Sequence, residues 1–217
     1  DSFNLEVELV TFSFFFMPNE ALQQQDIDLN VFQTKPYLDE QSKNRGYKFE
    51  IVGKTFVYPM AGYSKKIKNI SELKAGNTIV IPNDPTNLGR ALLLLQQKDI
   101  IKLKADVGLL ATAQDIIANP LNIKILELEA PQLTRTLDDD QVTVAIINNN
   151  FAASSNLTAK KDGLFVEDGE SPYINIIVSR QDNKTAEKVA NFVKAYQSKA
   201  VEAAADEQFK GGAIKGW

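Results

Sequence analysis

The chain has 217 residues, with 24 basic and 28 acidic side chains, a formal charge of −4 and 44% apolar residues. This composition is that of an ordinary globular protein, and it excludes both a disordered chain and a nucleic-acid binder that works through bulk positive charge. Cysteine and histidine are absent, which excludes disulfides, thiolate nucleophiles and Ser-His-Asp catalysis.

The first half of the chain alternates between strand and helix patterns. We expect, in order, a strand over 7–12, a short helix over 19–22 after Pro18, a strand over 27–31, a helix from Pro36 to Arg45 that ends at Gly46, and a β-rich stretch over 49–58 that is broken at Gly53. A basic surface segment, 65–68, follows.

The second half continues the alternation. We expect strands over 78–81, 123–126, 142–147 and 173–178, helices over 88–97, 113–118 and 184–198, a short helix after 148–150, and a last helix that runs to Phe209. Strands that alternate with helices predict an α/β protein with mainly parallel sheets. Because no low-complexity linker divides the chain, we expect two lobes joined by more than one crossing of the backbone.

Arg90 is the candidate functional residue that stands out most clearly. With a helix that begins near Leu88, Arg90 lies in the first turn, where a cation opposes the positive end of the helix dipole. The arrangement becomes favourable if a carboxylate or phosphate binds in front of the helix, with Gly89 allowing a close approach of the backbone. The alternative is a solvated arginine on a surface helix.

Two asparagines are further candidates. Asn148 follows the apolar strand 142–147, and ligands of α/β sheets bind beyond the carboxyl ends of strands. Turn formation or helix capping is the alternative role of this residue. Asn175 interrupts an apolar strand, where its amide needs a partner: a ligand, a backbone group or solvent.

An aromatic run precedes Pro18. Phe12, Phe14, Phe15 and Phe16 lie so close together that a strand would send their rings to both of its faces. The segment is therefore either a loop that lines an apolar pocket, to which Phe32 would add, or a strand covered on both sides. Core packing is the alternative for most of these rings.

These segments resemble the methionine-binding lipoproteins of bacterial methionine ABC importers. The resemblance covers nearly the whole chain, and the segments that carry it are 32–39, 81–90, 127–133, 145–148, 171–175 and 211–217. It implies an α/β, two-lobed periplasmic-binding-protein fold with a ligand cleft between the lobes and closure on a hinge. The first lobe would comprise residues 1–60 and 173–217, and the second would comprise residues 61–172.

The resemblance also assigns roles to residues. Arg90 would pair with the ligand carboxylate, and Asn148 and Asn175 would hold the carboxylate and ammonium ends. Phe15 and Phe32 would line the thioether pocket, because sulfur–aromatic contacts are favourable. The site list is completed by two residues: Tyr63, as a further candidate, and Thr34, which stands where the family usually has histidine.

The expected protein captures methionine and delivers it to the membrane subunits of an ABC importer. It would be a monomer of the periplasm or cell surface, with no catalytic residue, metal, cofactor or nucleic-acid partner, and lipid-anchored to the membrane outside this chain. The family begins with a lipidated cysteine and a strand–helix unit, so we expect the first lobe to lack that unit.

Three alternatives stay open at this point. The family usually has an Asp-Tyr pair where this chain has Phe14 and Phe15, and this change favours a binder of another small apolar amino acid. The same change, with Thr34, would also suit a non-transport surface protein that keeps the fold. An enzyme would have to use a carboxylate or lysine in the cleft, because histidine and cysteine are absent.

Overall fold

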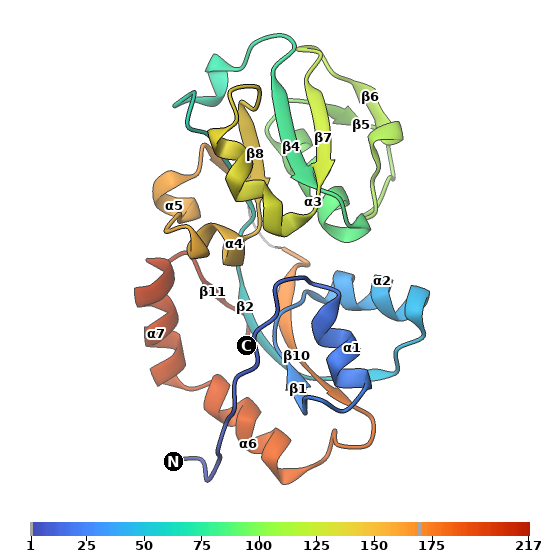
Figure 1. Ribbon diagram of the computed structural model, residues 1–217, viewed down its shortest axis with the longest axis vertical. Helices are drawn as coiled ribbons and strands as arrows, with labels where there is room; N and C mark the ends of the chain where they lie inside the picture. Colours follow the sequence, from blue (N-terminus) through green and yellow to red (C-terminus); the bar gives the residue numbers. More distant parts are fainter. Residues whose placement is uncertain (1, 169–170) are drawn as a thin grey trace. The chain divides into compact units, whose positions relative to one another are not determined.

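In the computed structural model, which describes residues 2–168 and 171–217, the chain forms two compact units (Figure 1). Unit 1 consists of residues 1–58 and 171–217, and unit 2 consists of residues 59–170. Along the sequence, unit 2 is thus inserted between two parts of unit 1. The lobe boundaries expected from the sequence, 60/61 and 172/173, each lie two residues from these.

Unit 1 contains a four-stranded antiparallel sheet. Its strands are, in spatial order, β1 (Leu29–Asn30), β10 (Ile174–Arg180), β2 (Phe49–Val57) and β11 (Ile214–Lys215). The expected break at Gly53 is wrong, because β2 runs through this residue and pairs it with Ile177. A Cβ at position 53 would lie 3.1 Å from Cγ1 of Val193, so the glycine makes room for a helix that packs on the strand.

Four helices cover the sheet of unit 1. They are α1 (Met17–Gln23), α2 (Lys35–Arg45), α6 (Glu187–Tyr196) and α7 (Lys199–Phe209). Leu22 of α1 and Leu38 of α2 pack on Ile176 and Val178 of β10, whereas Ala205 of α7 packs on the far end of β2. The expected bounds of α2 are confirmed: Pro36 lies in its first turn, and Gly46 ends it at a φ of 73°.

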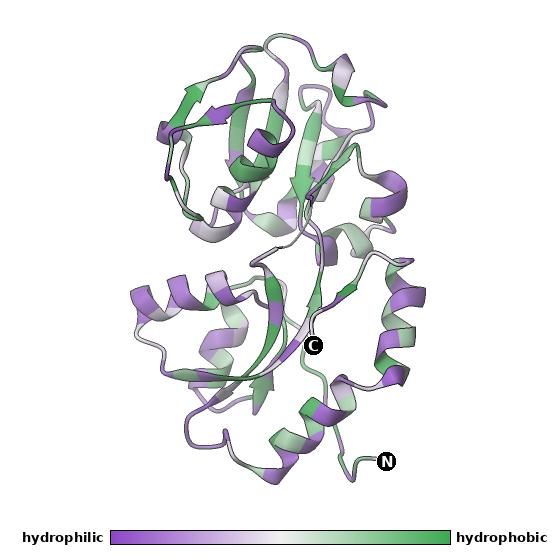
Figure 2. Ribbon diagram, turned by 180° about the vertical axis from the view of Figure 1, so that it is seen from behind, coloured by the Kyte–Doolittle hydropathy of each residue, from purple (hydrophilic) through white to green (hydrophobic). Residues whose placement is uncertain are grey.

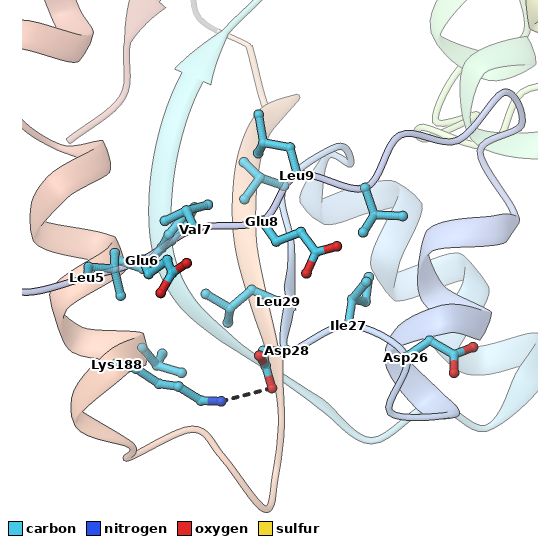
Figure 3. Close-up of a pocket in the computed structure, with 14 residues that line it drawn as sticks. Leu5, Glu6, Val7, Glu8, Leu9, Asp26, Ile27, Asp28, Leu29 and Lys188 are labelled. Carbon is cyan, nitrogen blue, oxygen red and sulfur yellow. Dashed lines mark ion pairs between the residues drawn. The ribbon is translucent and has the colours of Figure 1, made fainter.

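The expected strand over 7–12 is not formed. No sheet ladder joins this segment to another described strand, and the side chains of Val7 and Leu9 are 50% and 84% exposed. A groove of about 540 Å³ lies between the segment 5–10, the β1 region and α6 (Figure 3). Alternating apolar residues favour a strand only when a neighbouring strand is within hydrogen-bonding distance, and β1 lies across the groove.

Unit 2 is built on a five-stranded mixed sheet. Its strands are, in spatial order, β7 (Lys124–Leu128), β4 (Thr78–Pro82), β8 (Val144–Ile147), β3 (Ala61–Tyr63) and β9 (Phe165–Val166). Among the described strands of this sheet, only β4 has parallel partners, β7 and β8, and the other pairs are antiparallel. The expectation of mainly parallel sheets is therefore wrong, because a helical crossover between neighbouring strands occurs only between β4 and β7 in the described residues.

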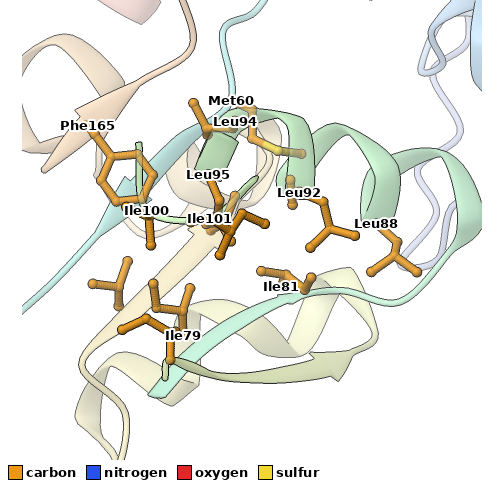
Figure 4. Close-up of a cluster of buried hydrophobic side chains, with 14 of the residues drawn as sticks. Met60, Ile79, Ile81, Leu88, Leu92, Leu94, Leu95, Ile100, Ile101 and Phe165 are labelled. Carbon is orange, nitrogen blue, oxygen red and sulfur yellow. The ribbon is translucent and has the colours of Figure 1, made fainter. Parts of the chain in front are cut away.

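Two apolar layers cover the sheet of unit 2. The first lies under α3 (Pro85–Gln97), where Leu88, Leu92 and Leu95 meet Ile79 and Ile81 of β4 (Figure 4). The second lies under the 3₁₀ helix η3 (Ala130–Asp138), α4 (Asn149–Ser154) and α5 (Ala159–Asp162). These layers fix the carboxyl ends of β4 and β8, from which the candidate ligand residues of this unit extend.

The expected helix over 113–118 is wrong. The segment forms a short 3₁₀ helix, η2 (Ala113–Asp115), followed by β6 (Ile116–Ala118), which pairs with β5 (Lys102–Leu103). The Asp115 carboxylate accepts a hydrogen bond from the Thr112 backbone N–H at 2.8 Å, and this cap holds a single turn. Two β-branched isoleucines follow and favour the strand.

Hydropathy follows these layers. The strands are coloured as hydrophobic over much of their length, whereas the helices alternate between hydrophobic and hydrophilic residues (Figure 2). Within residues 2–168 and 171–217, no helix combines the length and the apolar character needed to cross a membrane.

Candidate functional site

Arg90 lies in the second turn of α3 and not in the first. The helix begins three residues earlier than expected, with Asp84 as its N-cap and Pro85 at the first helical position. The Asp84 carboxylate accepts a hydrogen bond from the Asn87 backbone N–H at 3.0 Å and thus uses one of the donors at the helix start. The dipole argument for an anion site at Arg90 is therefore wrong.

Arg90 is nevertheless a buried residue with a specific partner. Its Nε and Nη2 donate to the two carboxylate oxygens of Glu167 at 2.9 and 2.7 Å. The two side chains are only 4% and 7% exposed, so the alternative of a solvated surface arginine is wrong. Bidentate pairs of this kind fix the plane of the guanidinium as well as its position.

A close approach to the backbone of Gly89 exists as expected, but the group that approaches is another segment of this chain and not a ligand. A Cβ at position 89 would lie 2.1 Å from the carbonyl oxygen of Leu109. The segment that contains Leu109 crosses α3 directly beside the residue that precedes Arg90. Gly89 is therefore required for packing of the helix within unit 2.

Asn148 joins Asn87 and Asp84 in a chain of polar contacts. It follows β8 and is 9% exposed, and its Nδ2 donates to Oδ1 of Asn87 at 3.0 Å. Asn87 Nδ2 in turn donates to the Asp84 carboxylate. Asn148 occupies the N-cap position of α4, as the capping alternative expects, but its side chain makes no capping hydrogen bond.

The second polar atom of Asn148 is the most informative one of unit 2. Its Oδ1 is buried and has no hydrogen-bond partner among the described residues. A buried acceptor without a partner costs about 1–3 kcal/mol, which a bound N–H donor would recover. Asn87 and Arg90 are three residues apart on α3 and share one face of the helix, so these polar groups form one cluster. We call Asp84, Asn87, Arg90, Asn148 and Glu167 the unit 2 polar cluster.

Tyr63 ends β3 and is 2% exposed. Its hydroxyl oxygen has no hydrogen-bond partner in the part of the chain that the structure describes. Burial, with a smaller contribution from the charge of Asp162, raises the pKa of the Tyr63 hydroxyl above its ordinary value. Tyr63 is thus a neutral buried hydroxyl, and it packs in the apolar layer under η3, α4 and α5.

Asn175 and Thr34 are brought together in unit 1. They form an isolated antiparallel bridge, and the next residue, Ile176, donates its backbone N–H to the Gln33 carbonyl at 3.0 Å. The Asn175 carbonyl accepts from the Thr55 hydroxyl at 3.0 Å, whereas its side-chain amide makes no hydrogen bond within the described residues. The backbone of Asn175 is therefore fixed, and its amide is left for another partner.

Thr34 has a local role that the sequence reading does not assign to it. Its hydroxyl accepts a hydrogen bond from the Tyr37 backbone N–H at 3.3 Å and caps α2. A threonine at this position can therefore be explained by helix capping alone.

Three aromatic rings meet beside Thr34. The centroid of the Phe15 ring lies 6.3 Å from that of Phe32 and 6.0 Å from that of Tyr37, and the Phe32 and Tyr37 centroids are 6.0 Å apart. The predicted pair of Phe15 and Phe32 is thus part of a trio, which we call the aromatic trio. The ring centroids of Phe14 and Phe16 are 5.7 Å apart, with the ring planes tilted by 33°, and both residues are partly exposed. The run divides between a packed side and a solvent side.

A network of buried side-chain amides fixes the backbone next to Phe32. Asn19, Asn30 and Gln33 exchange hydrogen bonds of 2.8 to 3.1 Å and are at most 5% exposed. Networks in which the amides satisfy one another are rigid. The network therefore fixes residue 33, which lies between Phe32 and Thr34.

Sequence reasoning missed four residues of these two groups. Glu167, Asn87 and Tyr37 contact predicted residues but were not predicted themselves, and Asp84, which binds Asn87, was not predicted either. Only Tyr37 had a usable signal, because it follows Pro36 in the first turn of α2. None of the seven predicted ligand residues lines the groove of Figure 3, whose rim carries Glu6, Glu8, Asp26 and Asp28. In the described residues no group of three acidic side chains is arranged to hold a metal ion.

Comparison with known proteins places the chain in a family. The profile of the NlpA lipoproteins matches residues 1–217. The chain belongs to the NlpA lipoprotein family. It is 61% identical to the D-methionine-binding lipoprotein MetQ of Escherichia coli K12 over 217 residues, which are 100% of this chain and 80% of that protein. MetQ of Salmonella typhimurium matches with the same identity and coverage.

Solved structures agree with this assignment. A crystal structure of the methionine binding protein MetQ has a TM-score of 0.98 at 61% identity and covers 100% of this chain and 88% of that one. A nutrient binding protein from Burkholderia cenocepacia bound to methionine has a TM-score of 0.94 at 44% identity, with 98% and 89% of the two chains covered. The fold is therefore the α/β fold of periplasmic substrate-binding proteins, as expected from the sequence.

Proposed function

We propose that the chain is a substrate-binding protein that captures methionine and delivers it to an ABC importer. The observation that carries the proposal is the 61% identity over the whole chain with D-methionine-binding lipoproteins. A structural relative at 44% identity has methionine bound. These relatives are binding proteins, and the chain has neither histidine nor cysteine for neutral-pH catalysis.

We propose that the polar end of methionine is bound by Arg90, Asn148 and Asn175. A guanidinium can donate to more than one acceptor, so a ligand carboxylate is a chemically suitable partner for Arg90 beside Glu167. The buried Oδ1 of Asn148 suits a ligand ammonium group, and the amide of Asn175 can serve either end. Tyr63 is the remaining candidate of unit 2.

The apolar end is assigned to unit 1. The aromatic trio brings together one ring that precedes α1 and two rings around the start of α2, and a thioether gains about 0.3–1.5 kcal/mol from contact with an aromatic ring. Thr34 lies beside the trio and bridges to Asn175.

Calorimetry with purified protein tests this assignment. We expect binding of methionine, a loss of affinity of at least about tenfold in Asn148→Ala and Asn175→Ala, and no change in Asn150→Ala, an exposed neighbour on α4. Leucine and norleucine report whether sulfur is recognised or only apolar bulk. Absence of methionine binding by the parent protein, or parent-like affinity in both variants, would overturn the proposal.

We further propose that the protein acts as a monomer in the periplasm or at the cell surface and is attached to the membrane as a lipoprotein. The relatives' names as lipoproteins support this location. Light scattering tests the monomer, because the chain has a mass of 24.1 kDa. A mass near twice that value, or retention on a nucleic-acid column at physiological salt, would contradict the proposal.

A further inference from the structure

We propose that Glu167 is a positioning residue for methionine binding, which holds the guanidinium of Arg90 and ties it to the two places where the chain enters and leaves unit 2. This inference rests on the proposed function. It concerns a residue that contacts Arg90 and is not itself one of the proposed ligand residues.

The contact geometry fixes the guanidinium in its own plane. The two carboxylate oxygens of Glu167 accept hydrogen bonds from Nε and Nη2 of Arg90, at 2.9 and 2.7 Å. Both side chains are almost fully buried, which shields these bonds from solvent, and a bidentate pair restrains the orientation of the guanidinium. A ligand carboxylate that binds Arg90 therefore meets a donor group whose orientation is set before binding, which lowers the entropic cost of binding.

Glu167 is in turn fixed by Met60. The Glu167 backbone N–H donates to the Met60 carbonyl at 2.9 Å, and the Met60 N–H donates back to Glu167 Oε1 at 3.2 Å. Unit 2 begins at residue 59 and ends at residue 170, so these two residues stand near its two ends. Arg90 is therefore linked through Glu167 to residues near both sequence ends of unit 2.

Asp168, the residue after Glu167, also contacts α3. Asp168 donates its backbone N–H to Gln97 Oε1 at 3.1 Å, and its carboxylate pairs with Lys98 Nζ at 2.8 Å. The segment 167–168 is thus attached to the second turn of the helix and to its carboxyl end. Asp168 differs from Glu167 in one respect that matters for a test, since its side chain is 70% exposed and contacts no proposed ligand residue.

A purely structural ion pair is the competing explanation. Buried pairs are retained in some proteins without a functional role, and their loss lowers stability for any ligand or none. A positioning role differs because it acts through the ligand carboxylate. Loss of a positioning residue must therefore lower the affinity for methionine more than the affinity for a methionine analogue whose carboxylate is replaced by an amide.

The test measures methionine and methioninamide affinities in Glu167→Gln, Glu167→Asp and the control Asp168→Asn. We expect Glu167→Gln to lose at least tenfold in methionine affinity and less than threefold in methioninamide affinity. Glu167→Asp, which keeps the charge on a shorter side chain, should recover part of the loss, and Asp168→Asn should stay within twofold of the parent. In an Arg90→Lys background, Glu167→Gln should add little further loss.

The outcomes separate the two proposals. If the parent protein binds no methionine, the proposed function fails. If the parent binds methionine and the Glu167 variants bind both ligands like the parent, or lose both equally, the positioning role is overturned and the proposed function stands. Should Glu167→Gln fail to fold by circular dichroism, the ratio of the two affinities in Glu167→Asp decides by the same criterion.

Discussion

Replacement of Gly89 by alanine tests how tightly unit 2 packs around the proposed carboxylate site. The new Cβ would lie 2.1 Å from the Leu109 carbonyl oxygen and 3.0 Å from the Ala111 nitrogen, whereas ordinary contacts begin at 3.4 Å. Both neighbours are backbone atoms, so no side-chain rotation relieves the clash. Either the segment 109–111 or α3 must move by more than an ångström.

Two effects of opposite sign set the magnitude. Alanine stabilises a helix interior by about 1 kcal/mol relative to glycine. Overpacking costs about 1–3 kcal/mol, and a clash with rigid backbone lies at or above the upper end of that range. We therefore expect a net loss of about 2 kcal/mol or more in the free energy of unfolding, equivalent to a decrease of about 4–8 °C in Tm.

Urea unfolding followed by circular dichroism measures this loss, and calorimetry measures the accompanying decrease in methionine affinity as α3 carries Arg90 with it. Lys194→Ala, at an exposed position of α6, is the control and should stay within about 0.5 kcal/mol of the parent. A Gly89→Ala protein that is more stable than the parent would show that helix propensity dominates and that the close approach of Leu109 does not exist in solution.

Three further expectations concern single groups. Asp84→Ala removes the N-cap of α3 and should cost about 1 kcal/mol in urea unfolding; an unchanged midpoint would mean that the cap is not formed. Burial raises the pKa of Tyr63 above its ordinary value of 10.0, so the unfolded chain releases this proton first and stability falls as pH rises above that value. Tyr63→Phe should reduce this alkaline loss, and an identical pH profile would contradict the burial. Phe15→Ala should lower the affinity for methionine by a factor at least about fivefold larger than its effect on the affinity for free alanine. An equal effect on both affinities would place Phe15 outside the thioether pocket.

Local signals predicted local structure well. The helix that became α2 is marked by Pro36 and Gly46, and its bounds are confirmed because capping depends on neighbouring residues. The strand 78–81 is confirmed for a similar reason, since the three consecutive β-branched residues Ile79, Val80 and Ile81 are buried together. The start of α3 was missed because Asp84 and Pro85, which set it, were assigned to a loop.

Long-range partners were beyond the reach of the sequence. Arg90 and Glu167 are 77 residues apart, and Asn148 and Asn87 are 61 apart, so nothing in either neighbourhood identifies the other. A buried arginine requires an acidic partner, but the chain has 28 acidic residues, and the sequence does not single out Glu167 among them. The strand expected over 7–12 failed for the opposite reason: its own pattern was suitable, but a strand exists only with a neighbour.

The insertion of unit 2 within unit 1 also orders events on the ribosome. Once residue 170 has been added, all of unit 2 has been made, yet β10, to which β1 and β2 are both bonded, has not. Because segments fold as they are completed during translation, the nascent amino-terminal part must wait, with its apolar side chains uncovered, while a later part of the protein matures first. Unit 1 is therefore the first of the two units to be started during translation and the last to be completed.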